Sequence, residues 1–235
     1  MDWLSGILGQ AVALILSGDA DLMEIVGLSL RVTLSAVTLA CLIGLPLGAL
    51  IGAFRFPGRT PIILILNTLM GLPPVVLGLI VYLMLTANGP LGTLRLLYTP
   101  TAMVIAQTLL VAPIVAALTR QVIEDLYGEY AEQFASLGVR AKHRVTALLW
   151  DARYSLLTVI LAGFGRAIAE VGAVQIVGGN INHHTRVMTT TIALETNKGN
   201  IELALALGVV LLSIALVVNA VVMALKASAA RSAYA

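Results

Sequence analysis

The ionisable residues of this chain are few, and many of them lie in one internal segment. Residues 120–153 hold ten of the 26 charged residues. We find no Ser-His-Asp or paired-carboxylate grouping of the kind that hydrolases use, so the sequence does not indicate an enzyme. The net charge of +2 is too small to indicate a nucleic-acid partner. Charge gathered in one segment is instead suited to contacting another protein in water.

The composition shows what surrounds this segment. Hydrophobic residues make up 59% of the chain and charged residues 11%, whereas a soluble domain carries about 25% charged residues. The mean hydropathy is +0.98. We therefore predict an all-α polytopic protein of the cell (inner) membrane. No segment rich in Pro, Gly or Ser separates domains, so we expect one membrane domain at 25–225, preceded by residues 1–24 and followed by a tail at 226–235.

Five segments are long and apolar enough to cross a membrane, which takes about 20 residues as a helix. They are residues 25–54, 61–85, 99–118, 155–177 and 201–225. A shorter apolar stretch, 3–16, has helical spacing and is predicted to lie along the membrane surface. A sixth span is the alternative for that stretch.

Lysine and arginine counts predict the orientation, because positive residues accumulate on the cytoplasmic side. With five spans and the N-terminus outside, nine of these residues lie inside and three outside. The three outer residues are Arg95, Arg186 and Lys198. The charged segment 120–153 and the C-terminus are then cytoplasmic.

The charged segment has the periodicity of helices. Tyr127, Tyr130, Phe134 and Leu137 recur three or four residues apart, and the pattern resumes after Gly138. We predict a helix, a turn at Gly138 and a second helix, since glycine takes positive φ without a Cβ clash.

Residues 132–138 resemble the cytoplasmic "EAA" loop of ATP-binding-cassette importer permeases, in which Glu-Ala-Ala is followed by Gly. Glu132, Ala135, Leu137 and Gly138 match that pattern. Gln133 and Phe134 replace the usual alanines, and 150–151 is Trp-Asp where many members have Leu-Pro.

A second run, 164–174, is similar to the Arg-Ala-x-x-Glu-x-Gly-Ala run of molybdate- and tungstate-type oxyanion permeases. Residues 66–76, 177–181 and 189–195 resemble the tungstate branch in particular. The resemblance covers about residues 25–225 and implies a type I (MetI-like) importer core, paired as a homodimer.

The same resemblance implies partners and a mechanism. A cytoplasmic ATPase subunit would hold ATP-Mg, and this chain would need no cofactor; the sequence has no Gly-x-x-x-x-Gly-Lys-Ser/Thr phosphate loop. An outside oxyanion-binding protein would deliver tungstate or molybdate, which crosses by alternating access. The predicted residues for coupling to the ATPase are Glu129, Glu132, Phe134, Ala135, Leu137 and Gly138.

Two features inside the predicted spans are candidates for the translocation path or gate. Arg166 and Glu170 stand four residues apart near the middle of 155–177; such charges cost about 2.5–3.5 kcal/mol each on insertion scales and so find partners. A mutual or interface ion pair that only holds helices together is the alternative. Asn67, Pro73 and Pro74 interrupt 61–85, where the prolines predict a kink or break.

His183, His184 and Arg186 lie in a predicted outer loop. Without further ligands nearby in sequence they do not predict a metal site, and we interpret them as a surface for the binding protein. A plain solvated loop is the alternative. For the whole chain, the alternatives are a permease for another substrate such as sulfate, a self-contained ion-coupled carrier or channel, and a structural subunit.

Overall fold

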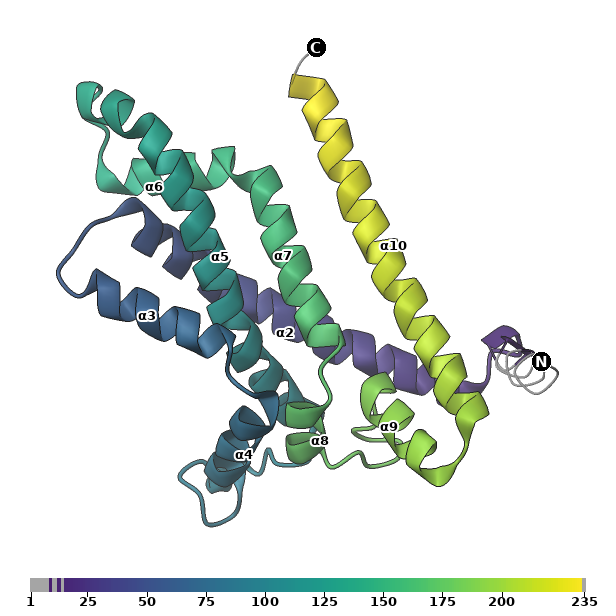
Figure 1. Ribbon diagram of the computed structural model, residues 1–235. Helices are drawn as coiled ribbons and strands as arrows, with labels where there is room; N and C mark the ends of the chain where they lie inside the picture. The colour runs from purple at the N-terminus through teal and green to yellow at the C-terminus, as the bar shows by residue number, and fades with distance from the viewer. Residues whose placement is uncertain (1–8, 10–11, 14, 234–235) are drawn as a thin grey trace. The chain divides into compact units, whose positions relative to one another are not determined.

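The computed structural model describes residues 9, 12–13 and 15–233, and the regular secondary structure of this part of the chain is all helical (Figure 1). The helices, in chain order, are α2 (Ala20–Ala53), α3 (Arg59–Met70), α4 (Pro74–Leu85), η1 (Gly92–Leu94), α5 (Pro100–Ser136), α6 (Ala141–Asp151), α7 (Arg153–Ile168), α8 (Gly172–Gly178), α9 (Met188–Lys198) and α10 (Ile201–Ala233). The predicted all-α class is confirmed.

Three of these helices are long and apolar enough to cross a membrane by themselves: Ala20–Ala53, Pro100–Ser136 and Ile201–Lys226. They correspond to the first, third and fifth predicted spans. Two bent pairs, α3 with α4 and α6 with α7, raise the number to five if each pair forms one span. The second predicted span is thus broken where its prolines stand: Pro73 precedes α4 and Pro74 is its first residue, a position that proline favours.

The prediction that 155–177 forms one helix is wrong. α7 ends at Ile168 and α8 begins at Gly172. Glu170 Oε1 accepts a hydrogen bond of 3.0 Å from the backbone N–H of Ala173, so this carboxylate satisfies a free donor in the first turn of α8. Arg166 and Glu170 therefore do not share one helix face, because the helix ends between them.

The first long helix, α2, begins at Ala20, five residues before the predicted start of the first span at residue 25. Asp19 Oδ1 accepts from the N–H of Leu22 at 2.9 Å, which caps the helix and fixes its start. The predicted boundaries of the membrane domain, at 24/25 and 225/226, fall inside α2 and α10. Most of the predicted surface helix, 3–16, lies outside the described residues and stays a prediction.

The chain forms two compact units, each assembled from three stretches. Unit 1 consists of Met1–Ala36, Pro73–Gln107 and Ala167–Val218, and unit 2 of Val37–Leu72, Thr108–Arg166 and Asn219–Ala235. A buried cluster in unit 1 joins α2, α9 and α10 through Leu22, Ile25, Met188, Ala206 and Leu207. Because the stretches alternate along the chain, no linker in the sequence marks the two units.

Close helix packing in unit 2 depends on glycines of α2. A Cβ added at Gly48 would meet the carbonyl oxygen of Ala116 and lie 2.7 Å from Thr119 Cβ. A Cβ added at Gly44 would lie 2.8 Å from Val115 Cβ. α2 and α5 therefore approach so closely that no side chain fits at these positions, as expected for helices that pack within a membrane.

We predict that Gly48→Ala destabilises the protein by about 1–3 kcal/mol, because the added methyl group meets backbone that cannot move aside. Gly27→Ala is the matched control in the same helix, since a Cβ there meets nothing within 4 Å. The control should be neutral or stabilise by up to about 1 kcal/mol through helix propensity. Thermal unfolding in detergent measures both; equal melting temperatures for the two variants would contradict the packing described.

Candidate functional site

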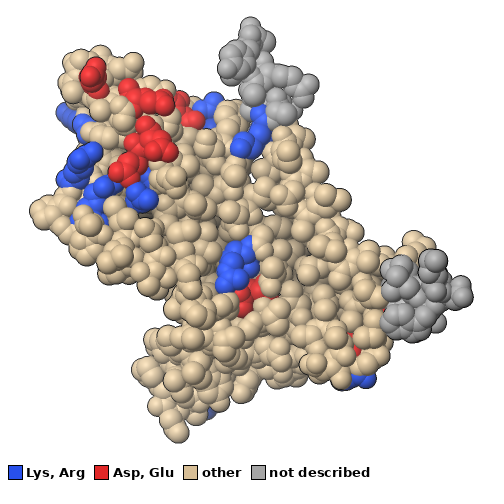
Figure 2. All heavy atoms as spheres, in the orientation of Figure 1, with Lys and Arg blue, Asp and Glu red and all other residues tan. Residues whose placement is uncertain are grey.

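The charged segment forms a helical hairpin, which we call the coupling hairpin and define as residues 120–153. Its first arm is the end of α5, which continues without a break from the third span to Ser136. The predicted turn at Gly138 is confirmed, with φ +60°. Gly138 N–H donates to Ala135 O at 3.3 Å and Val139 N–H to Phe134 O at 3.1 Å. This is the Schellman pattern of a helix end, which favours glycine at this position. Charged side chains gather here on the face shown in Figure 2.

Arg144 of α6 fixes the second arm against the first. Its Nη1 donates to Tyr127 Oη at 3.2 Å and its Nη2 to Val139 O at 3.3 Å. The guanidinium also lies over the rings of Tyr127 and Phe134, 5.7 and 5.9 Å from their centroids. Cation–π contacts of this kind contribute about 0.5–1 kcal/mol each at partly exposed sites. One side chain thus joins both helices and the turn.

The contacts of Arg144 separate the predicted coupling residues into one that packs inside the hairpin and others that are exposed to solvent. Phe134 is half-buried and stacks on Tyr127, with centroids 6.4 Å apart, so it supports the hairpin from within. Leu137 is 76% exposed and Trp150 is 69% exposed. The other predicted coupling residues are exposed as well: Glu129, Glu132, Ala135 and Gly138. Sequence reasoning missed Arg144, which it counted only as a topology charge, and Trp150, which it treated only as a departure from the family pattern.

A second charged group ties the base of the coupling hairpin to α3. Glu124 Oε1 lies 2.9 Å from Arg59 Nη2, and its Oε2 pairs with Arg120 Nη1. Arg59 Nε also donates to Ile51 O at 2.8 Å, near the end of α2. Glu124 is thus held between two arginines, and Arg59 links this carboxylate of α5 to α3 and to the end of α2.

The candidate path residues are divided between the two units. Asn67, exposed on α3, and Arg166, in the last turn of α7, belong to unit 2. Pro73, Pro74 and Glu170 belong to unit 1. Within unit 1 the two helix breaks are neighbours, because a Cβ added at Gly172 would lie 2.8 Å from Val75 Cγ2. The starts of α4 and α8 therefore pack directly against each other.

Beside the break at Glu170 is a buried polar cavity of about 10 Å³. Its polar lining residues are at most 9% exposed and are Ser29, Thr33, Gln107, Glu170 and Thr189. Gln107 Nε2 donates to Ala167 O at 3.1 Å, so its Oε1 must point the other way, and that oxygen has no partner within the described residues. Thr189 donates to Glu170 O at 2.7 Å. Little more than one water fits here, and the lining is rich in acceptors, so this cavity does not suit a tetrahedral oxyanion.

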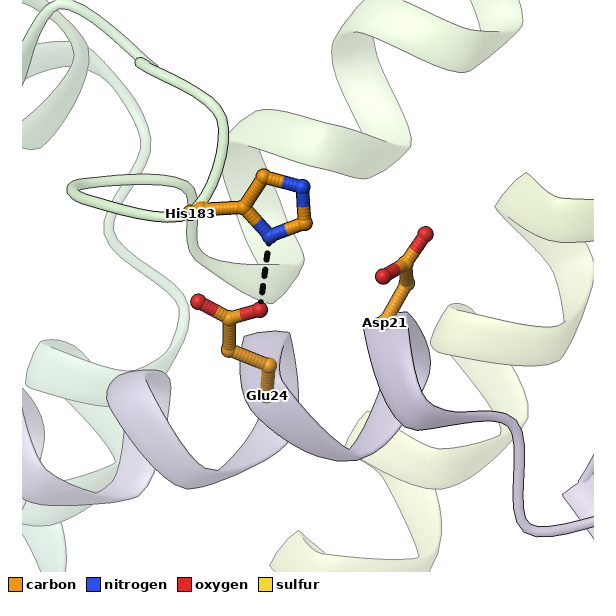
Figure 3. A group of neighbouring side chains, drawn as sticks. All are labelled: Asp21, Glu24 and His183. Atoms are coloured by element: carbon orange, nitrogen blue, oxygen red, sulfur yellow. Dashed lines mark hydrogen bonds and ion pairs between the residues drawn. The ribbon is translucent and has the colours of Figure 1, made fainter.

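The predicted outer-loop residues form a separate group in unit 1 with the start of α2. His183 Nδ1 lies 2.8 Å from Glu24 Oε2, and Asp21 stands one turn before Glu24 (Figure 3). His184 and Arg186 line the same small hollow. The sequence missed Asp21 and Glu24, which lie about 160 residues away along the chain.

Metal-ligand atoms of Asp21, Glu24 and His183 lie within 4.8 Å of one another. All three residues are exposed, exposed acidic groups of this kind are common without an ion, and Arg186 lines the same hollow. We therefore assign the contact to an ion pair. The hydrogen bond from the protonated ring to Glu24, and the charge of that carboxylate, raise the pKa of His183 above its usual value.

The sequence matches known transport proteins over most of its length. The family model described as binding-protein-dependent transport system inner membrane component matches residues 44–231. A probable anion ABC transporter permease protein of Haloferax volcanii is 40% identical over 211 residues, covering 86% of this chain and 91% of that protein.

Two further relatives are named tungstate uptake system permease protein TupB. The one from Peptoclostridium acidaminophilum is 38% identical over 226 residues, covering 96% of this chain and 99% of that protein. The one from Campylobacter jejuni is 36% identical over 226 residues, covering 96% of this chain and 95% of that protein. The resemblance to the oxyanion permeases is confirmed.

We predict that Gly138→Leu destabilises the turn by about 1–2 kcal/mol, because a side chain is strained at positive φ. A Cβ there meets nothing within 4 Å, so the cost is conformational rather than a clash. Gly138→Asn is the matched variant and should cost less, since asparagine tolerates this region. Limited proteolysis of the hairpin in the full-length protein measures the effect; equal cleavage of both variants would show that the turn does not depend on positive φ.

We predict that the imidazole of His183 titrates at higher pH in the wild type than in Glu24→Gln. The pair stabilises the protein fully below the usual histidine pKa of about 6.5, and this contribution disappears as pH rises through the raised pKa. An NMR titration with labelled histidine measures both values, with His143 of α6 as internal reference. A His183 pKa that does not fall in Glu24→Gln would rule out the pair.

Proposed function

Because the chain belongs to the family of binding-protein-dependent transport system inner membrane components, we propose that it is the membrane-spanning subunit of an ATP-driven importer for an oxyanion, tungstate first and molybdate second. Its homologues are permease subunits, so its own part is transport rather than catalysis. The substrate rests on the names of the relatives and on the tungstate-like sequence runs.

The coupling hairpin is the observation that carries this proposal. It is an internally braced pair of helices that exposes two large apolar side chains, Leu137 and Trp150, among charged residues. Solvated apolar side chains on an ordered, charged surface are typical of a protein contact. We propose that they enter a groove of the ATPase subunit, which holds ATP-Mg, and that the surrounding acids Glu129 and Glu132 align the two proteins.

The charge clamp at Glu124 supplies a route from this contact into the membrane part. A displacement of α5 at the coupling hairpin is passed to Arg59, the first residue of α3, because Glu124 holds both. We propose that α3, with Asn67, and the breaks at Pro73, Pro74 and Glu170 respond by opening the path to one side at a time. Broken helices occur at membrane depth where they are buried in protein or line a water-filled cavity. Arg166 is the candidate cation along the path.

The arrangement that this mechanism requires has five spans, the N-terminus outside, the C-terminus inside, and two copies of the chain forming one pore. We propose that His183, His184 and Arg186 then contact the binding protein outside. The ion pair of His183 with Glu24 holds this loop to the start of α2, and Arg186 is one of only three outer cations.

We predict that Leu137→Ala lowers both tungstate uptake and uptake-linked ATP hydrolysis about fivefold or more, since truncating an apolar contact at an interface centre typically costs over 1 kcal/mol. Uptake is measured in a strain lacking the permease gene and carrying the variant at wild-type membrane levels. Leu212→Ala is the matched control, because Leu212 of α10 is 71% exposed but lies outside the hairpin.

If Leu137→Ala transports like the wild type, or Leu212→Ala is equally impaired, the assigned contact is wrong. If the wild-type gene restores uptake of another oxyanion but not of tungstate or molybdate, the proposed substrate is wrong while the transport class stands.

A further inference from the structure

A groove in unit 2 lies between α5, α7 and the end of α10, and it has about 350 Å³ of space. α5 contributes Leu118, Gln121, Val122 and Asp125, and α7 contributes Ser155, Thr158, Val159 and Ala162. Each set recurs at spacings of three and four residues, so each is one face of its helix. Lys226 of α10 closes the third side.

The groove is polar at one end and apolar at the other. α5 and α7 run in opposite directions here, because Gly163 of α7 packs on Val111 and Val115 of α5, beyond the end marked by Leu118 and Ala162. Asp125 and Ser155 consequently share the opposite end. Lysine and arginine counting places that polar end at the cytoplasmic boundary of the membrane and the apolar end within the hydrocarbon.

The polar end of the groove carries one negative and one positive side chain, Asp125 and Lys226. Within the described residues the exposed Asp125 carboxylate has no ion-pair partner. The Lys226 ammonium uses one of its three donors on Thr158 Oγ1, at 2.6 Å, and two remain. Gln121 and Ser155 add neutral donors. The end therefore offers one cation with donors for an anionic group, and one carboxylate for a group that is itself cationic and carries N–H.

We propose that this groove binds a phospholipid with a phosphoethanolamine headgroup. Lys226 and the neutral donors hold the phosphate, Asp125 accepts from the primary ammonium, and an acyl chain lies on Leu118, Val122, Val159 and Ala162. An anionic headgroup without the ammonium would leave Asp125 facing negative charge. Phosphocholine would fill the same space, but its quaternary ammonium has no N–H to donate.

The lipid would stabilise the state in which α10 stays beside α5, because it bridges Lys226 of α10 and Asp125 of α5. This gives the permease a dependence on membrane composition that is separate from the oxyanion and from the ATPase.

The test is lipid retention by the full-length purified protein, measured by native mass spectrometry after exposure to equal amounts of phosphatidylethanolamine, phosphatidylcholine and phosphatidylglycerol with identical acyl chains. We expect phosphatidylethanolamine to be retained about fivefold over the other two, the size of one partly exposed charge contact. Asp125→Asn should abolish its advantage over phosphatidylglycerol, and Lys226→Met should lower retention of both. Asp151→Asn and Lys142→Met, which lie outside the groove, should behave as the wild type.

Equal retention of the three lipids by the wild type would overturn the proposal, as would an unchanged preference in Asp125→Asn. A second copy of the chain is the other possible occupant. Ala162→Cys in a Cys41→Ser background reports on it: a disulfide between two copies in native membranes would show that the groove is a subunit interface and not a lipid site.

Discussion

One guanidinium group joins both arms of the coupling hairpin and its turn. Arg144 donates to Tyr127 Oη on one arm and to Val139 O at the turn, and it lies over the rings of Tyr127 and Phe134. The first arm continues without a break along α5 to Glu124, which pairs with Arg59 of α3, so the proposed transmission of motion from the hairpin would follow one helix.

Within the membrane part, two helices are interrupted rather than continuous. In hydrocarbon, a broken helix leaves backbone groups that water cannot satisfy, so breaks require side chains that replace the lost bonds. Glu170 caps α8, and Thr189 donates to the Glu170 carbonyl. Pro73 and Pro74 need no partner for the N–H groups that they lack. Close helix packing at Gly44 and Gly48 and helix breaks at 71–73 and 169–171 thus occur in the same short chain.

Much of this could be predicted from the sequence, and the failures have physical causes. The apolar runs predicted the long helices, and Gly138 predicted the turn, because hydropathy and positive φ are local properties. The break after Ile168 could not be predicted from periodicity, since Glu170 looks like a mid-span charge until its contact with Ala173 is known. The inward position of Phe134 depends on Arg144, ten residues later, and the pairing of His183 with Glu24 depends on the tertiary fold.

The most direct measurement of the central claim is the number of tungstate ions moved per ATP hydrolysed, in proteoliposomes that contain the permease, its ATPase and the binding protein. We expect this ratio to fall severalfold in Arg144→Gln while the ATPase stays bound and hydrolyses ATP. Arg144→Lys, which keeps the charge but loses the paired donors, should be intermediate, and Arg140→Gln should match the wild type. An unchanged ratio in Arg144→Gln would contradict the account.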